Sequence, residues 1–279
     1  MRSAAQQFPG RGQQASERIH DVRKTLKEAC AIARLFLPSL GEPARVTIAA
    51  LAVARRRVGR ARDLDVIEQR LRRLAPPSEI GEPLIAAVAR DRAVALSAHA
   101  NFAATASRAQ LNAIAKRVDG WDLGGIGERD IVEAAARTYA QARRRGRLAF
   151  RGDDPAALHA LRSRVVDLRY QLAALSPAWP AALNAQAEEL NALRDTLGAF
   201  NDFTVLAAFA AERGGLAPEP LELLRAQLQA KQKKLRRRAK AEFDRLFAET
   251  PDAFADRLAA YLKRPLKKPA LAAKTQSTT

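Results

Sequence analysis

The chain has 279 residues and a net charge of +18, from 48 Lys and Arg against 30 Asp and Glu. A chain of this length can bury a sizeable core without disulfides or metal ions. Its single cysteine, Cys30, excludes an internal disulfide framework and is typical of a reducing compartment. No run approaches the roughly 18 uncharged apolar residues of a membrane span, and the polar N-terminus is unlike a signal peptide. We therefore expect a cytoplasmic protein that binds a polyanion and has no membrane partner.

The composition is that of a helical protein. Ala, Leu, Arg and Glu are abundant and form helices well, and no useful stretch alternates apolar and polar residues as a strand would. Proline and glycine separate the periodic segments. The sequence predicts an all-α fold with helices over 16–37, 43–75, 83–117, 128–145, 155–175, 179–212, 219–249 and 251–263.

The two ends of the chain differ from its middle. Residues 1–15 are polar and residues 264–279 are basic, so both are expected to be disordered, and the folded domain is expected to cover 16–263. Inside that domain, Asp154 before Pro155 is typical of an N-cap followed by proline at the first helical position.

The chain contains an internal repeat. A shift of 139 residues aligns His20 with His159 and Arg23 with Arg162, and the chain has only three histidines. The same shift, without a gap from residue 19 to residue 67, aligns Pro38 with Pro177, Leu51 with Leu190, Arg55 with Arg194, Gly59 with Gly198, and Asp63 with Asp202. The repeat predicts two pseudo-symmetric four-helix bundles, about 16–147 and 154–263, packed around a basic central groove.

The first helix of each half has a basic face. At about 100° per residue, apolar side chains such as Val22 and Leu26 lie opposite a face that is almost purely cationic. That face carries His20, Arg23, Lys24, Lys27 and Arg34. In the second copy, the matching face carries His159, Arg162, Arg169 and Tyr170. Because like charges four residues apart repel, an uncompensated stripe of this kind indicates an anionic ligand.

The following helices add further basic residues and one acid per half. Arg56, Arg62 and Arg194 lie in the second helices, together with Asp63 and Asp202. Each aspartate suits either a salt bridge or the orientation of a ligand-binding side chain. Lys231 and Lys234 share a stripe of the helix over 219–249, where the alternatives are a solvated charge run and a general nucleic-acid patch.

These segments resemble a known family. IHDVRKTLKEACAIARLFLPSL (19–40) and ALHALRSRVVDLRYQLAAL (157–175) are similar to the two signature helices of the CHAD family, the conserved histidine α-helical domain. RARDLDV (60–66) and LRDTLGAFNDFTVL (193–206) resemble its second-helix segments. The resemblance covers residues 16–262. The family is often fused to a triphosphate tunnel metalloenzyme domain, for which this chain has no room, so a stand-alone binder is expected.

The resemblance implies two four-helix bundles around a basic groove, binding of long-chain inorganic polyphosphate, and association with polyphosphate granules. Carried over by position, the ligand-facing residues are His20, Arg23, Lys24, Lys27, His159, Arg162, Arg169 and Tyr170, with Arg56, Arg62, Arg194, Lys231 and Lys234 as additions. The chain departs from the family at Val166, where a Lys or Arg is usual, so the second half is expected to bind less tightly. No cofactor is implied.

Three other functions remain open at this point. Nucleic-acid binding predicts stacking aromatics beside the basic patches, and Tyr170 is the only one on a signature face. A metal-dependent phosphohydrolase needs clustered carboxylates or histidines, whereas each half repeats one aspartate among arginines. An adaptor would use the groove or an outer face for a protein. We expect a binding protein and not an enzyme, with other polyanions as possible secondary ligands.

Overall fold

The described part of the chain is entirely helical. The computed structural model describes the backbone of residues 13–57, 60–100 and 104–263, and the side chains of 21–56, 64–94 and 108–263. These residues form ten α-helices and no strand, which confirms the all-α prediction. The helices are α2 (Gln13–Leu40), α3 (Glu42–Arg57), α4 (Arg60–Leu74), α5 (Ser78–Ala100), α6 (Ala104–Asp119), α7 (Glu128–Ala149), α8 (Pro155–Leu175), α9 (Pro180–Arg213), α10 (Pro218–Leu246) and α11 (Pro251–Lys263).

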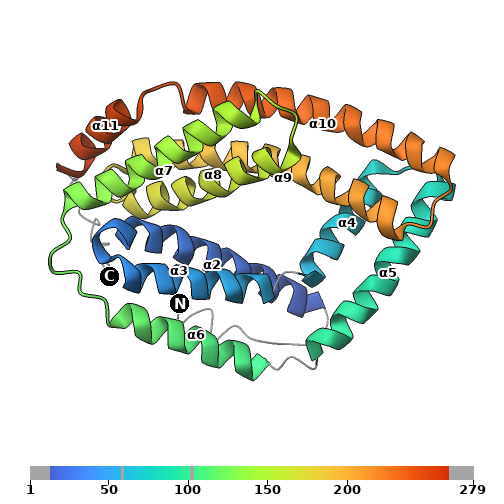
Figure 1. Cartoon of the computed structure of the whole chain (residues 1–279), viewed down its shortest axis with the longest axis horizontal. Helices are drawn as coiled ribbons and strands as arrows, with labels where there is room; N and C mark the ends of the chain where they lie inside the picture. The colour runs from blue at the N-terminus through green and yellow to red at the C-terminus, as the bar shows by residue number, and fades with distance from the viewer. Residues whose placement is uncertain (1–12, 58–59, 101–103, 264–279) are drawn as a thin grey trace, which may run out of the picture.

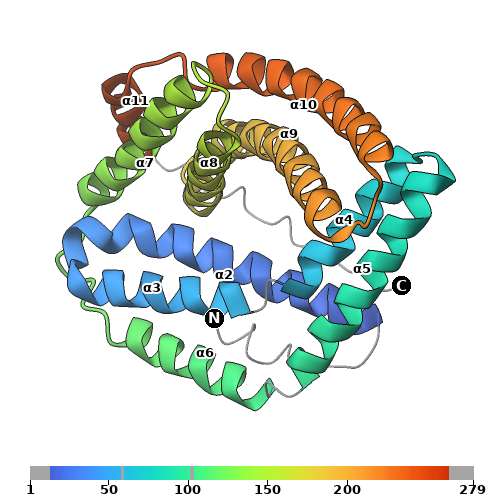
Figure 2. The ribbon, with the colours of Figure 1, turned by 45° about the vertical axis from the view of Figure 1, so that its right-hand side comes forward.

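Figure 1 shows two layers of helices joined at one end. One layer holds α7, α8, α9, α10 and α11, and the other holds α2, α3 and α6, while α4 and α5 close the right-hand end of the view. Figure 2 shows α2 and α3 side by side as a helical hairpin, with α6 beyond α3. The layers meet where α2 packs against α7 and α8. Helix α8 therefore packs against α7 and α9 of its own layer and against α2 of the other layer.

Local chemistry explains several helix boundaries. The carboxylate of Asp154 accepts a hydrogen bond from the Ala156 N–H at 2.9 Å, with Pro155 at the first helical position, so α8 begins where the sequence predicts. Helix α2 ends one turn later than expected, at Leu40, and Pro38 lies inside its last turn. Gly41, with φ of +60°, supplies the left-handed residue that ends the helix.

Two of the long helices that the sequence predicts each correspond to two helices in the structure. The segment expected over 43–75 forms α3 and α4, with residues 58–59 outside the described part, and the segment over 83–117 forms α5 and α6, with residues 101–103 outside it. Figure 1 shows that α3 and α4 run in different directions. The corresponding segment of the second half, which contains Gly198, belongs to the continuous helix α9.

Gly146 was predicted to end a helix, and this is wrong. It lies inside α7 and is buried against α10, where a Cβ atom would stand 2.0 Å from Cε2 of Phe243. The missing side chain is what allows the two helices to approach each other so closely.

The hydrophobic cores do not divide at the boundary between the two predicted halves. One core is built by the five helices from α7 through α11 and includes Leu35 of α2. A second core is shared by α4, α5, α9 and α10. A third lies among α2, α3 and α6. Because helices from both halves build the second core, two separate four-helix bundles are not confirmed. None of the described helices is both long and apolar enough to cross a membrane.

Candidate anion-binding site

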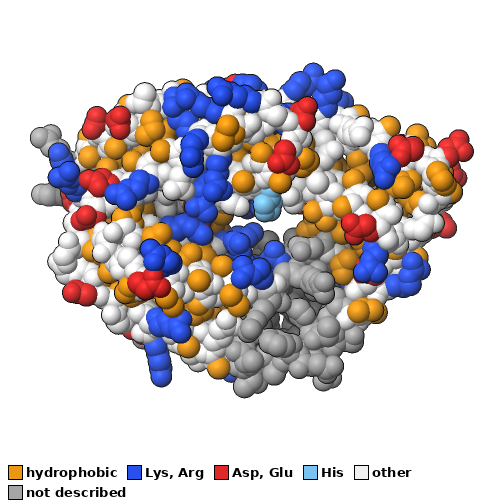
Figure 3. Space-filling model, in the orientation of Figure 1, with side chains coloured by type: hydrophobic (Ala, Val, Ile, Leu, Met, Phe, Trp, Pro, Cys, Tyr) orange, Lys and Arg blue, Asp and Glu red, His pale blue; other side chains and the backbone are white. Residues whose placement is uncertain are grey.

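Basic side chains from four helices gather where the two layers meet. Figure 3 shows Lys and Arg side chains along the left side of a hollow in the middle of the front face, with more of them continuing toward the upper edge of that face. Helix α2 packs against α3 and α8, and α8 packs against α9. These four helices carry the central cation cluster, which we define as Arg23, Lys27, Arg55, Arg162 and Arg194.

Lys27 reports the electrostatics of this cluster most directly. Burial and, after it, the charges of the four arginines of the cluster together lower the pKa of its ammonium group to about 8. Both effects oppose the charged amine, and no acidic group offsets them among the main influences on Lys27. The surroundings of Lys27 are therefore strongly positive.

Arg162 is held across the surface of α9. Its guanidinium lies over Gly198, where a Cβ atom would stand 3.3 Å from Nε and 3.4 Å from Nη2. Burial and, after it, the charge of the neighbouring Arg194 lower the pKa of Arg162. The negative charges of Asp202 and Asp195 oppose this shift. The Nε atoms of Arg162 and Arg194 are buried and find no hydrogen-bond partner among the described residues. The repeated glycine thus provides room for a basic side chain at the site.

The acids nearest the cluster are bound to individual arginines. Asp195 pairs with Arg194 in a short contact between neighbouring residues of α9. Asp202 accepts hydrogen bonds from Nε and Nη2 of Arg70 in α4, at 3.1 Å and 2.8 Å. The sequence predicted that Asp202 either forms a salt bridge or orients a basic side chain of the first helix. The structure places it in a salt bridge to α4, which links the two halves.

His159 is exposed and is oriented by α9. Its Nδ1 lies 3.0 Å from Oδ1 of Asn201. Because an amide oxygen only accepts hydrogen bonds, Nδ1 donates and Nε2 is the ring nitrogen left for a ligand. The sequence singled out His159 but not Asn201 as the residue that positions it.

Arg34 belongs to a buried ion-pair network instead of the open face predicted for it. Its Nη1 lies 3.1 Å from Oδ1 of Asp167 in α8, and Nη2 of Arg164 lies 2.9 Å from the other carboxylate oxygen. Asp167 is 5% exposed. Burial raises the pKa of this carboxyl, and both arginines oppose that shift. The network ties α2 to α8 and leaves Arg34 a structural role.

Tyr170 is likewise placed in the contact between α2 and α8. It is 7% exposed and packs with Ala31 and Val166, and the guanidinium carbon of Arg169 lies 3.9 Å from its ring centroid. Val166 stands at the repeat position of Lys27 and packs against α2. The second copy of the basic face is therefore partly converted into packing surface, which removes its only aromatic from the open side.

Four of the remaining predicted residues are exposed and do not belong to the cluster. Lys24 on α2, Arg56 on α3, and Lys231 and Lys234 on α10 are exposed. Three others, His20, Arg62 and Asp63, have side chains outside the described part of the structure. These assignments stay predictions.

Arg55 is the cation that the choice of site residues missed. It acts on Lys27, whereas Arg56, chosen in its place, is exposed on the neighbouring side of α3. The internal repeat held the signal, because the shift of 139 residues aligns Arg55 with Arg194. A step of one residue turns a helix by about 100°, so the wrong neighbour faces away from the site.

The described side chains offer binding chemistry more readily than metal chemistry. Among them, no group of three or more His, Cys, Asp or Glu residues is placed to hold a metal ion. Guanidinium groups donate paired, charge-assisted hydrogen bonds to phosphate oxygens. Fixed donors of this kind on four helices suit an anion with several phosphoryl groups.

Comparison with known proteins gives one match. The model of the CHAD domain family matches residues 2–211, a range that includes α2 through most of α9. No curated protein and no solved structure matches the chain.

Proposed function

The chain belongs to the CHAD family, and on that premise we propose that it binds inorganic polyphosphate at the central cation cluster. The family is associated with polyphosphate binding. The observation that carries the proposal for this chain is the position of Lys27, half-buried among four arginines from α2, α3, α8 and α9. A bound polyanion would offset the repulsion between the Lys27 ammonium and these four arginines, and no acid is among the main influences on Lys27.

The number and kind of the donors favour a phosphate polymer over a single phosphate. A polymer with about one negative charge per phosphate can contact several fixed cations, each by a charge-assisted hydrogen bond of roughly 1.5–3 kcal/mol before entropic costs. Both repeats contribute, through Arg23 and Arg162. A chain long enough to reach both gains the second contact intramolecularly, so affinity rises with chain length.

The surroundings of the cluster favour polyphosphate over nucleic acid. Single-stranded nucleic acids gain about 1–3 kcal/mol for each base that stacks on an aromatic side chain. The central cation cluster contains no aromatic residue, and Tyr170, the aromatic predicted beside it, is buried in the contact between α2 and α8. A ligand without bases, such as polyphosphate, does not depend on stacking and so loses no binding energy in a site that lacks aromatic side chains.

The finer points of the proposal follow from the same repeat. We infer that the two repeated segments are related by a pseudo-two-fold axis, and that their basic faces meet in one central groove. The protein then acts in the cytoplasm as a non-enzymatic binder and associates with polyphosphate granules. A binder with this charge would coat a polyanionic granule by the contacts that hold a single chain.

Calorimetric titration tests the proposal. Long-chain polyphosphate, orthophosphate, tripolyphosphate and charge-matched RNA are titrated into wild type and into Arg162→Gln/Arg194→Gln. The control is Arg129→Gln/Arg137→Gln, which removes the same charge from two exposed arginines of α7 that pair with Glu133. We expect binding that increases with chain length, exceeds RNA binding, and weakens in the cluster variant alone. An equal loss of affinity in both variants, or RNA binding as tight as polyphosphate binding, would mean that the protein offers only a general cationic surface.

A further inference from the structure

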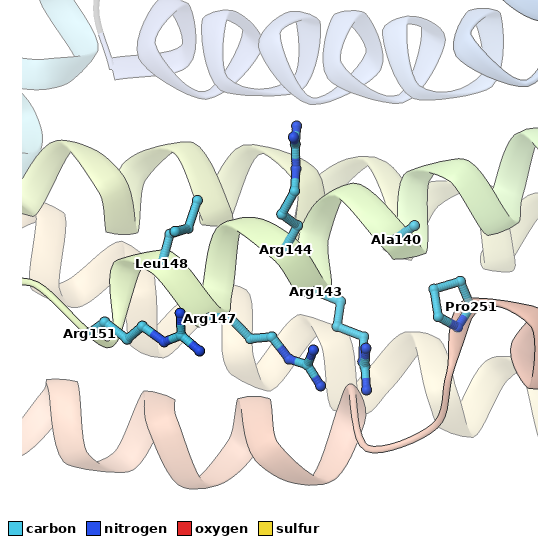
Figure 4. A pocket seen from close by; sticks show the side chains of 7 residues that line it. All are labelled: Ala140, Arg143, Arg144, Arg147, Leu148, Arg151 and Pro251. Atoms are coloured by element: carbon cyan, nitrogen blue, oxygen red, sulfur yellow. The ribbon is translucent and has the colours of Figure 1, made fainter.

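A second group of arginines lies on α7 and in the turn after it, outside the two repeated faces. Arg143 and Arg147 are one turn apart on α7, about 6 Å along the helix axis, and Arg151 follows two residues past the end of the helix. Figure 4 shows Arg143 and Arg147 reaching toward the side of α10, and Arg151 extending along the same side toward Arg147, whereas Arg144 points the opposite way. Three guanidinium groups thus lie in a row on one side of the molecule, two on α7 and one just past its end.

The row lines a groove. A cavity of about 270 Å³ lies along α7, where Arg143, Arg144, Arg147 and Arg151 are joined by Leu148 and by Pro251 at the start of α11. Arg143 is fixed in place, because its Nε donates to the carbonyl oxygen of Phe247 at 3.0 Å, just past the end of α10. We call this feature the α7 groove.

Three acids of α10 and of the loop before α11 are paired with basic residues outside the α7 groove. Glu242 and Asp244 of the facing helix α10 bind Arg238 and Lys240 of the same helix. Both carboxylate oxygens of Glu249, before α11, accept from Arg257.

Two arginines of the groove, in contrast, have no such partner among the described residues. Within the described part of the chain, neither Arg147 nor Arg151 forms an ion pair, and both side chains are exposed. At the other end of the same helix, Arg129 and Arg137 share Glu133. The groove end of α7 therefore differs from the rest of the helix in lacking counter-charges.

We propose that the α7 groove is a second anion-binding site, which takes consecutive phosphoryl groups of a linear phosphate chain. The nature of the ligand rests on the proposed function, but the site is separate from the central cation cluster. A row of donors spaced along a helix and the turn after it matches an extended chain better than a compact anion, which needs donors that converge. Figure 3 shows Lys and Arg side chains continuing from the central hollow over α7 toward the upper edge of the face. One long chain could therefore occupy both sites.

Two ligand classes other than phosphate would use the same charges and are tested as competitors. An acidic peptide brings carboxylates, and RNA brings a phosphate backbone with bases. The groove lining contains no aromatic side chain on which a base could stack. Arginine's planar group binds phosphate oxygens in pairs, which favours a phosphate chain over single carboxylates.

The experiment counts sites with a short probe. Tripolyphosphate is titrated calorimetrically into wild type, Arg147→Gln/Arg151→Gln, Arg162→Gln/Arg194→Gln and the control Arg129→Gln/Arg137→Gln, with poly-glutamate and RNA as competitors. All three variants lose two positive charges. Thermal unfolding of each variant checks that it is folded. We expect wild type and the control to bind at two sites, and the groove variant to lose one of them. Its affinity for long-chain polyphosphate should fall about tenfold, equivalent to about 1.4 kcal/mol, with a shallower salt dependence.

The outcomes separate this inference from the proposed function. If the groove variant matches the control while Arg162→Gln/Arg194→Gln is defective, the second site is refuted and the central site stands. If only the groove variant is defective, the groove stands and the central proposal fails. If poly-glutamate or RNA displaces tripolyphosphate from the groove at equal charge, the phosphate-chain assignment is refuted. If wild type binds neither tripolyphosphate nor long-chain polyphosphate, both proposals fall.

Discussion

The binding of polyphosphate should depend on pH through Lys27. Burial and four neighbouring arginines lower the pKa of this amine to about 8, so a growing fraction of the free protein carries a neutral Lys27 as pH rises. A bound polyanion favours the charged amine, so binding requires the uptake of a proton above that pKa.

The size of the effect follows from the pKa. At pH 7 nearly all of the free protein already carries the proton, whereas at pH 9 only about one molecule in ten does. If the amine stays charged in the complex, the dissociation constant rises about tenfold between these pH values. At pH 8, about half a proton should be taken up per site.

The assay is a calorimetric titration with long-chain polyphosphate at several pH values and constant ionic strength, because salt alone changes the affinity. Repeating the titration in buffers of different ionisation enthalpy measures the proton uptake. Lys27→Arg is the matched variant, since it keeps the charge but does not titrate in this range. We expect its affinity to be flat between pH 7 and 9. A tenfold loss in Lys27→Arg as well, or no loss in wild type, would refute the assignment of Lys27 to the site.

Three further predictions concern stability, measured by urea unfolding. Because the pKa of Lys27 is lower in the folded protein than in the unfolded chain, the unfolded state binds more protons between pH about 8 and 10; wild type should therefore gain stability over that window relative to Lys27→Met, and the variant should be more stable than wild type at pH 7. Asp167→Asn leaves two partly buried guanidinium groups without their carboxylate and should cost about 3–5 kcal/mol; a loss below about 1 kcal/mol would contradict the buried network. Gly146→Ala places a methyl group 2.0 Å from the Phe243 ring and should cost about 1–3 kcal/mol, part of which Phe243→Leu should restore; an unchanged midpoint would contradict the close approach of α7 and α10.

Much of the fold could be predicted because local rules decide helix ends. The N-cap at Asp154 and the proline that follows act within four residues, so the start of α8 is read from the sequence alone. Gly146 shows the limit of such rules. A glycine weakens a helix locally, but here the neighbouring helix α10 needs the space, and only the tertiary packing reveals that need.

The candidate site was predicted in part for a similar reason. Helical periodicity gave a basic face to each first helix, and Arg23, Lys27 and Arg162 are indeed brought together with Arg194. Periodicity cannot tell which part of a face meets solvent and which part meets another helix. Arg34 lies on the same face as Lys27 but two turns further along, where α8 presents Asp167. The repeat alignment was the better guide, because it pairs Arg55 with Arg194 by structural position.

The asymmetry between the two repeats has a physical basis. Lys27 has Val166 as its counterpart, and Val166 packs with Ala31 in the contact that joins α2 to α8. A lysine at that position would have to be buried in this contact, beside a cluster that already lowers the pKa of Lys27. The fold thus accommodates one half-buried amine at the junction of the layers, and the second repeat contributes guanidinium groups at Arg162 and Arg194, which are more weakly hydrated and lose less on burial. The site is therefore assembled from unlike contributions of two related segments, and a phosphate chain crossing it would meet a different donor set from each half.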